Sequence, residues 1–204
     1  MKIAVVGLGA IGGLVAARLA LAGHDVCGVA RGATLDAVRS DGLRLRIDGS
    51  EKTATLRVSS DARELGPQDL VVIAFKGPAL IESAAALRPL LQAGTIVLPA
   101  MNGVPWWFLQ AAPTALPSDV AGEPLASVDP GGRIAATLPL AQVLGCVVHL
   151  TCSTPEPGVV QHGFGNRLVI GEPAGGQSSR TKAVCELLSH AGFTTEASAD
   201  IRND

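Results

Sequence analysis

The sequence predicts an α/β protein with a doubly wound, mostly parallel sheet and helices on both faces of that sheet. Three observations support this fold class. Short apolar runs rich in β-branched residues recur along the chain, as is typical of buried parallel strands. Segments with apolar residues at helical spacing alternate with these runs. A glycine-rich turn, GLGAIGG at residues 7–13, joins the first such strand to the first such helix.

The first thirty residues read as one strand–helix–strand unit. KIAVV (2–6) is short, apolar and β-branched, which indicates a buried strand. Residues 10–22 are rich in alanine and leucine, and Gly23 follows where a helix cap is expected. DVCGVA (25–30) is a second buried strand, so this length fits one βαβ unit.

The middle of the chain predicts further alternation. LRLRI (43–47) and TATLRV (53–58) alternate apolar and polar residues around the turn DGSE, which indicates an antiparallel hairpin. Pro105 stands in the first turn of an expected helix, where its missing N–H is not needed. The remaining expected elements are helix 34–40, strand 69–75, helix 79–92, strand 95–99 and a helix over 104–112.

A segment rich in proline and glycine, residues 113–132, reads as an insertion or a lid, because strand patterns resume after it. We expect one domain over residues 1–198 that includes this insertion. Its remaining elements are strands 143–152, 158–164 and 167–171, helix 178–190 and strand 193–198.

Composition excludes several classes of function. The 204 residues are 48% apolar with a net charge of −2 and scattered bases, unlike the basic stripe of a nucleic-acid-binding protein. No uninterrupted apolar run is long enough for a membrane span, and no secretory leader pattern is found. The four cysteines lack zinc spacing and read as free thiols, so we expect a cytoplasmic protein without a metal site.

The glycine turn has the spacing of a dinucleotide-binding fingerprint. Gly7 permits the tight turn, Gly9 lets the backbone approach a pyrophosphate, and Gly12 lets the helix pack closely on the sheet. The pyrophosphate would lie on the free N–H groups of the helix start. The alternative is a turn that merely needs glycine, but the flanking strand and helix favour a dinucleotide site.

The end of the second strand indicates which dinucleotide. An NAD site favours Asp or Glu there, whereas this chain has Ala30, Arg31 and Gly32. A guanidinium suits the 2′-phosphate of NADP(H). The alternative is a solvated surface arginine.

Two further polar side chains follow apolar strands at their carboxyl ends, where ligands bind in such sheets. Lys76, in the run AFKG, follows the expected strand 69–75. Asn102, in the run PAMNGVP, follows the expected strand 95–99. Lysine suits a cofactor phosphate or a substrate carboxylate, and asparagine suits the nicotinamide ribose and a substrate hydroxyl. The alternatives are a solvated lysine and an ordinary Asn-Gly turn.

This ordered set of motifs resembles the ketopantoate reductase family, the 2-dehydropantoate 2-reductases. The motifs are GLGAIGG, Arg31, FKG, MNGV and PGVVQHGFGNRLVIGEP. The resemblance implies NADPH-dependent reduction of a 2-oxo acid to a 2-hydroxy acid, in pantothenate biosynthesis. It implies that Asn102 also faces the substrate and that the Thr151 backbone contacts the cofactor. The implied cofactor-binding residues are Gly7, Leu8, Gly9, Ala10, Ile11, Gly12, Arg31, Lys76, Asn102 and Thr151.

Two departures from the family pattern shape the expectations. Trp106, Trp107 and the insertion follow the Asn-Gly pair, so the substrate is ketopantoate or a relative, and the tryptophans either cap the core or narrow a pocket. Family members continue into a helical C-terminal domain that carries the proton-donor lysine. We therefore expect residues 199–204 to begin a linker, the donor to lie beyond residue 204, and no catalytic residue within this chain.

A function of another class stays open. The chain could be a non-catalytic NADP(H)-binding or interaction module on the same scaffold. A missing domain would leave an apolar surface, so self-association into a homo-oligomer is also expected.

Overall fold

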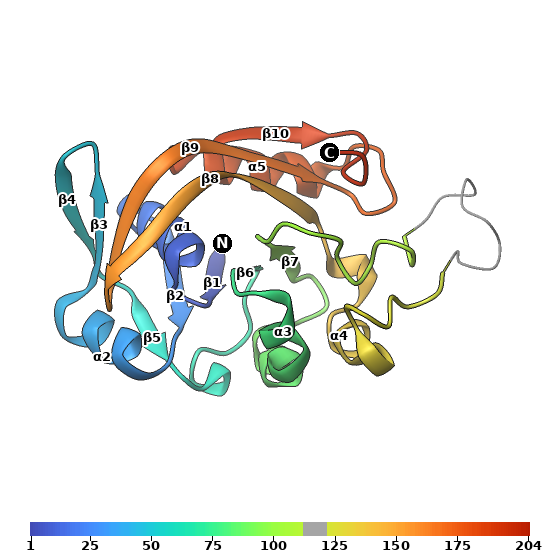
Figure 1. Ribbon diagram of the computed structural model, residues 1–204, viewed down its shortest axis with the longest axis horizontal. Coiled ribbons are helices and arrows are strands. Elements are labelled where there is room, and N and C mark those ends of the chain that lie inside the picture. The colour runs from blue at the N-terminus through green and yellow to red at the C-terminus, as the bar shows by residue number, and fades with distance from the viewer. Residues whose placement is uncertain (112–121) are drawn as a thin grey trace.

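The computed structural model describes residues 1–111 and 122–204 and contains two sheets (Figure 1). The first sheet has five parallel strands in the order β5-β2-β1-β6-β7. These are β1 (Lys2–Val6), β2 (Asp25–Val29), β5 (Arg57–Ser59), β6 (Leu70–Ile73) and β7 (Ile96–Pro99). The chain leaves β1 toward β2 and later crosses to β6, so the winding direction changes beside β1. The predicted fold class is confirmed.

The second sheet is mixed and packs over the first. Its order is β10-β9-β3-β4, with β8 paired antiparallel to β9. Its strands are β3 (Leu43–Ile47), β4 (Ser50–Ala54), β8 (Gly145–Glu156), β9 (Val159–Gly171) and β10 (Thr194–Ser198). Figure 1 shows the long β8 and β9 arching over α1 (Ala10–Leu21), and α1 contacts strands of both sheets.

The described part of the chain contains four further α-helices and four 3₁₀ helices. The α-helices are α2 (Gly32–Asp41), α3 (Gly77–Ser83), α4 (Arg133–Thr137) and α5 (Ser179–His190). The 3₁₀ helices are η1 (Ala62–Glu64), η2 (Ala84–Leu90), η3 (Pro130–Gly132) and η4 (Leu140–Gln142). Helices α3 and α4 both contact η2 on the face of the first sheet opposite α1, whereas α5 packs beside β9 and β10.

The alternation of side chains along β1 divides the interior into two cores. Ile3 and Val5 belong to the core that contains α1 and the inner face of the second sheet. Ala4 and Val6 belong to the opposite core, which includes Trp106 at 1% exposure. Because both faces of β1 are buried, its sequence is a continuous apolar run rather than an alternating one.

Several predicted elements need correction. The expected strands 158–164 and 167–171 are one continuous strand, β9. The second hairpin strand begins at Ser50 rather than residue 53 and ends at Ala54. The last two residues of TATLRV, Arg57 and Val58, belong to β5, which pairs with β2. The expected helix 79–92 is α3 followed by η2, because Pro89 cannot supply an α-helical N–H. No helix forms over 104–111, which is a series of turns.

The proposed insertion lies partly outside the described residues, since these omit 112–121. Its described end contains Asp129, which is fully buried. The Asp129 carboxylate accepts hydrogen bonds from the backbone N–H groups of Ile134 and Ala135, at 2.8 and 3.0 Å, and so fixes the start of α4. Within the described ranges, no helix is long and apolar enough to cross a membrane.

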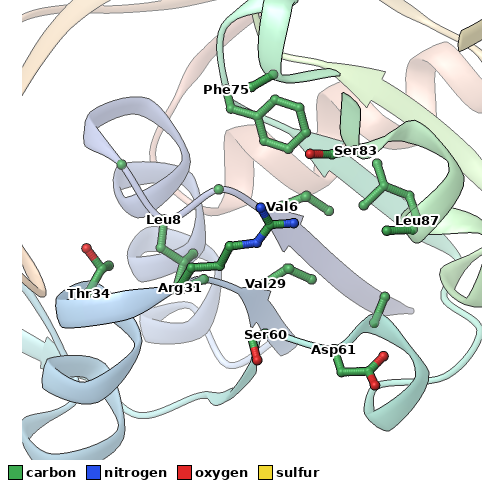
Figure 2. Close-up of a pocket in the computed structure, with 16 residues that line it drawn as sticks. Val6, Leu8, Val29, Arg31, Thr34, Ser60, Asp61, Phe75, Ser83 and Leu87 are labelled. Atoms are coloured by element: carbon green, nitrogen blue, oxygen red, sulfur yellow. The ribbon is translucent and has the colours of Figure 1, made fainter. Parts of the chain in front are cut away.

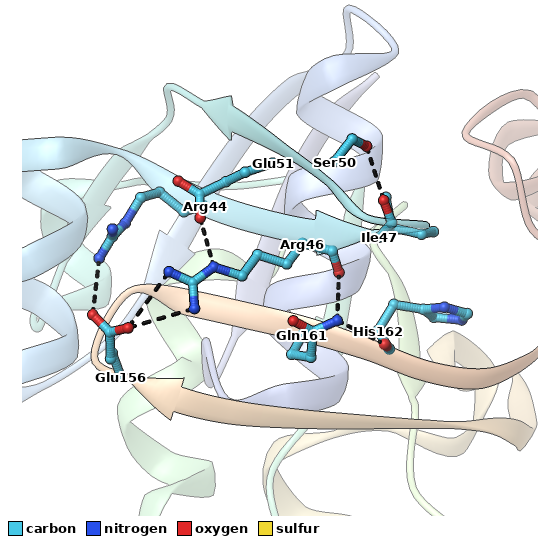
Figure 3. Close-up of polar contacts among 8 residues, drawn as sticks. All are labelled: Arg44, Arg46, Ile47, Ser50, Glu51, Glu156, Gln161 and His162. Atoms are coloured by element: carbon cyan, nitrogen blue, oxygen red, sulfur yellow. Dashed lines mark hydrogen bonds and ion pairs between the residues drawn. The ribbon is translucent and has the colours of Figure 1, made fainter.

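A polar network joins the β3–β4 hairpin to the β8–β9 pair (Figure 3). The Arg46 guanidinium lies 2.6 Å from Glu51 and 3.4 Å from Glu156, and Arg44 lies 3.6 Å from Glu156. The Gln161 amide also donates to the Arg46 carbonyl at 3.5 Å. The arginines are partly exposed and the two glutamates are exposed, so these ion pairs add little stability.

Candidate functional site

The glycine turn between β1 and α1 requires two of its glycines sterically. Gly7 has a φ of +91°, which L side chains rarely adopt, and its N–H donates to the Val29 carbonyl at 2.9 Å. A Cβ on Gly12 would lie 2.0 Å from the Gly7 carbonyl oxygen. The turn therefore brings the helix start against the end of β1, as the fingerprint predicts.

The start of α1 is open to a ligand. Gly9 is the N-cap residue, no side chain caps the helix, and the first turn contains no acidic residue. A Cβ on Gly9 would meet nothing within 4 Å, so the space beside the turn is free. The first-turn N–H groups of Ala10, Ile11 and Gly12 and the helix dipole thus form a site suited to an anion.

A cleft of about 510 Å³ lies beyond the carboxyl ends of β1, β2 and β5. Its base is the glycine turn, with Gly7, Leu8 and Gly9 among the lining residues. Apolar side chains from the η2 side, including Leu87, form the opposite wall. A flat apolar group and an anionic group could both be accommodated in one such cleft.

Arg31 extends into this cleft. It is the N-cap residue of α2 and is solvent-exposed, and no hydrogen bond or ion pair joins its guanidinium to another residue of the described part. Figure 2 shows it reaching over the strand ends that carry Val6 and Val29, with Phe75 and Asp61 on opposite sides. The guanidinium is thus available to an anionic ligand.

Sequence reasoning missed the loop after β5. Ser60 and Asp61 line the same cleft, although they lie thirty residues beyond Arg31. Arg63 donates to the Asp61 carboxylate at 2.6–3.0 Å, and this contact holds the Asp61 pKa below its ordinary value. The sequence feature that could have indicated this loop is the short run RVS (57–59). From the sequence alone this run looks like the end of the hairpin, because its pairing with β2 is not visible there.

The other predicted residues lie apart from this cleft. Lys76 is exposed at the N-cap of α3, directly after the cleft residue Phe75. Asn102 lines a second pocket, and its amide both donates to the Val148 carbonyl and accepts from the Val148 N–H, at 3.0 and 2.8 Å. The Thr151 hydroxyl accepts from the Phe164 N–H at 2.9 Å, and Thr151 lines neither pocket.

The potential metal ligands and the cysteine thiols can be described from the side chains. Among the described residues, no group of three or more potential ligands is arranged for a metal ion. All four cysteines are free, and burial raises the pKa of the Cys146 thiol to about 12. A thiol with such a pKa is protonated at neutral pH and is a poor nucleophile.

The fold and the cleft define a class of protein. A strand, a glycine turn and an open helix start form one βαβ unit, and a basic residue follows its second strand. The free space beside Gly9 suits a pyrophosphate, and the close approach at Gly12 suits the helix packing of the fingerprint. The chain has a Rossmann-type fold, an architecture that in many proteins binds dinucleotides.

The family follows from comparison with known proteins. The family described as "Ketopantoate reductase PanE/ApbA" matches residues 3–107, which is half of the chain. The chain belongs to this ketopantoate reductase family. The members of this family are pyridine-nucleotide-dependent oxidoreductases that act on a small 2-oxo acid.

Individual proteins similar to this chain support the family assignment. A 2-dehydropantoate 2-reductase of Mesorhizobium japonicum is 41% identical over 205 residues, which cover 100% of this chain and 62% of that protein. A Ralstonia solanacearum structure assigned to the ketopantoate reductases has a TM-score of 0.92 and 50% identity, over 98% of this chain and 61% of that one. A D-mandelate dehydrogenase structure with NADH shares the fold, at a TM-score of 0.79 and 20% identity, over 98% of this chain and 58% of that one. The chain thus spans about three-fifths of the length of these proteins.

Proposed function

We propose that this chain binds NADPH and supplies the cofactor-binding part of a reductase that converts a 2-oxo acid, 2-dehydropantoate or a relative, into a 2-hydroxy acid. One observation carries the proposal: the uncapped start of α1 and the unpaired Arg31 line the same cleft. An N-terminal anion site and a guanidinium, both in one cleft, match the pyrophosphate and the 2′-phosphate of NADP(H).

Each predicted residue has a place in this proposal. The backbone of residues 7–12 would hold the pyrophosphate, and Arg31 the 2′-phosphate. Lys76, next to the cleft residue Phe75, would add positive charge toward the phosphates. When bound, the cofactor supplies hydride to the 2-oxo carbon. The Asn102 amide holds its loop against β8, and this loop and the Thr151 backbone would border the nicotinamide end.

The proton must come from another group. The reduction of a carbonyl needs a proton donor near its oxygen. Among the described residues, no lysine lines either pocket. We therefore infer that the donor lysine lies beyond residue 204, and that the 204-residue chain binds NADPH with little turnover. Domain bounds of 1–198, with 199–204 as the start of a linker, are part of this proposal. Four free thiols further favour a cytoplasmic location, and self-association remains a prediction.

The experiment is a fluorescence titration with NADPH and with NADH. Arg31→Ala should weaken NADPH binding by about 1–3 kcal/mol more than NADH binding, because a charge-assisted contact is lost. Arg133→Ala is the matched control, since Arg133 is also exposed but lines neither pocket. Equal losses for both nucleotides would show that Arg31 does not read the 2′-phosphate.

A turnover assay separates the reductase from the binding module. Reduction of ketopantoate by the 204-residue chain at rates usual for an enzyme would contradict a donor outside it. NADPH binding that no 2-oxo acid influences, in a longer chain as well, would favour the non-catalytic module.

A further inference from the structure

A second pocket of about 280 Å³ lies where β7 ends and β8 begins, and residues 201–204 close one side. Its volume is close to the lower end of the roughly 300–1,000 Å³ typical of small-molecule sites. The walls are mostly apolar, from Met101, Val104, Pro105, Phe108, Val147 and Ile201.

Two buried N–H groups belong to side chains that line this pocket. The Trp107 Nε1 and the Arg202 Nε are both buried, and neither has a hydrogen-bond partner within the described part of the chain. Trp107 is 4% exposed. Buried donors are nearly always paired, because leaving one unpaired costs about 1–3 kcal/mol. A ligand with acceptor oxygens at this pocket would give these two unpaired donors partners.

Arg202 is held at the pocket by packing rather than by polar contacts. The preceding Ile201 is 5% exposed and lies against Gly145 and Gly171, which face each other in the β8–β9 register. A Cβ on either glycine would come within 2.7–2.8 Å of Ile201, so only glycine allows this approach. The Arg202 guanidinium also lies 5.1 Å from the centre of the Phe108 ring.

The charge of Arg202 is not neutralised by the other residues of the pocket. Asp204 is the one carboxylate among the described lining residues, and it accepts a hydrogen bond from the Ser198 hydroxyl. No ion pair with Arg202 occurs in the described part of the chain. The pocket thus combines apolar walls, two donors and one positive charge.

We propose that this pocket binds a small branched carboxylic acid, whose carboxylate accepts from the Arg202 guanidinium and the Trp107 indole N–H. This inference rests on the proposed function, because the 2-oxo acid proposed there carries a carboxylate and a branched apolar body. It adds two substrate-binding residues that the motifs did not indicate. Asn102 lies at the same pocket, which places the acid beside the loop that follows β7.

The test is a tryptophan fluorescence titration of the 204-residue chain with ketopantoate and with ketopantoyl lactone, which keeps the carbon skeleton but has no carboxylate. We expect the acid to bind at least about tenfold more tightly than the lactone. Arg202→Gln should weaken acid binding about tenfold to a hundredfold and leave lactone binding nearly unchanged. Arg133→Gln is the matched control.

Two more variants guard against a simple folding defect. Arg202→Lys keeps the charge but loses the Nε–H, so its affinity should lie between those of the wild type and Arg202→Gln. Trp107→Phe keeps a ring but loses the donor, and Trp106 remains as the reporter. The affinity of the Trp107→Phe variant for the acid should fall roughly threefold to tenfold. Thermal unfolding of each variant checks that the fold is retained.

The outcomes separate this proposal from the proposed function. Equal affinity for acid and lactone, or an unchanged affinity in Arg202→Gln, overturns the carboxylate site. NADPH binding without acid binding overturns the pocket alone. Acid binding that depends on Arg202, without NADPH binding, supports the pocket and overturns the cofactor proposal.

Discussion

The two pockets of this molecule are built in different ways. At the base of the cleft beside β1, the groups suited to an anion are backbone groups: the turn at Gly7, the open N-cap at Gly9 and the first turn of α1. The pocket beside β7 presents side chains from three distant segments, near residues 101–108, 146–147 and 201–204. Backbone sites depend on local chain geometry, whereas side-chain sites depend on how distant segments pack.

This difference predicts different responses to mutation. A side chain added at Gly12 should affect the first cleft and the whole fold together, because Gly12 sets the distance between α1 and β1. Changes around Ile201 should affect the second pocket and leave the first cleft intact. The following variants test this separation.

The largest effect is expected for Gly12→Ala. The new Cβ would meet the Gly7 carbonyl oxygen at 2.0 Å, and backbone cannot move aside as a flexible side chain can. We expect a loss of about 3 kcal/mol or more in the free energy of unfolding, the upper end of overpacking costs. Urea denaturation measures it. A variant as stable as the wild type would show that α1 need not approach β1 so closely.

Ile201→Ala should come next, with a loss of about 2–3 kcal/mol for a truncated buried side chain. Because Ile201 holds Arg202 at the second pocket, ketopantoate binding should fall while NADPH affinity stays within about twofold. Ile201→Val is the conservative control, and its free energy of unfolding should fall by about 1 kcal/mol. An equal loss of NADPH affinity would mean that the two pockets are not independent.

Gly9→Ala, unlike Gly12→Ala, should affect NADPH binding more than stability. Its Cβ would meet no protein atom within 4 Å, so stability should change by about 1 kcal/mol or less. The methyl group would nevertheless occupy the space expected for the pyrophosphate. NADPH affinity should therefore fall by about tenfold or more, measured by titration beside a denaturation curve. An unchanged NADPH affinity would show that the pyrophosphate does not bind beside the glycine turn.

The smallest effect concerns pH. Hydrogen bonds from Arg180 hold the pKa of Glu172 below its ordinary 4.5, and Arg180 also donates to the Val143 carbonyl, next to β8. A lowered carboxyl pKa stabilises the fold above about pH 4.5, and this stabilisation is lost as the pH falls through the folded-state value. Glu172→Gln should flatten the acid side of the pH–stability curve. An unchanged curve would show that other carboxylates govern it.

The accuracy of the sequence predictions varied with the range of the contacts involved. The unit 2–30 was predicted within a residue or two, since strand, turn and helix are encoded by neighbouring residues. The run TATLRV was misassigned because its last two residues, Arg57 and Val58, pair with β2, thirty positions earlier. Asp61 was missed for the same reason. Asn102 was expected to share the cofactor cleft, but its amide is paired with Val148 and lines the other pocket.

The sequence by itself determined the dinucleotide fold, the glycine turn and the place of Arg31 beside it. These depend on backbone freedom and on apolar periodicity, both readable over a few residues. Only the tertiary structure decided that a second sheet covers α1, that Gly145 and Gly171 receive Ile201, and that Trp107 and Arg202 share one pocket. Those features arise from close packing between segments as much as a hundred residues apart, and no local pattern records which surfaces will meet.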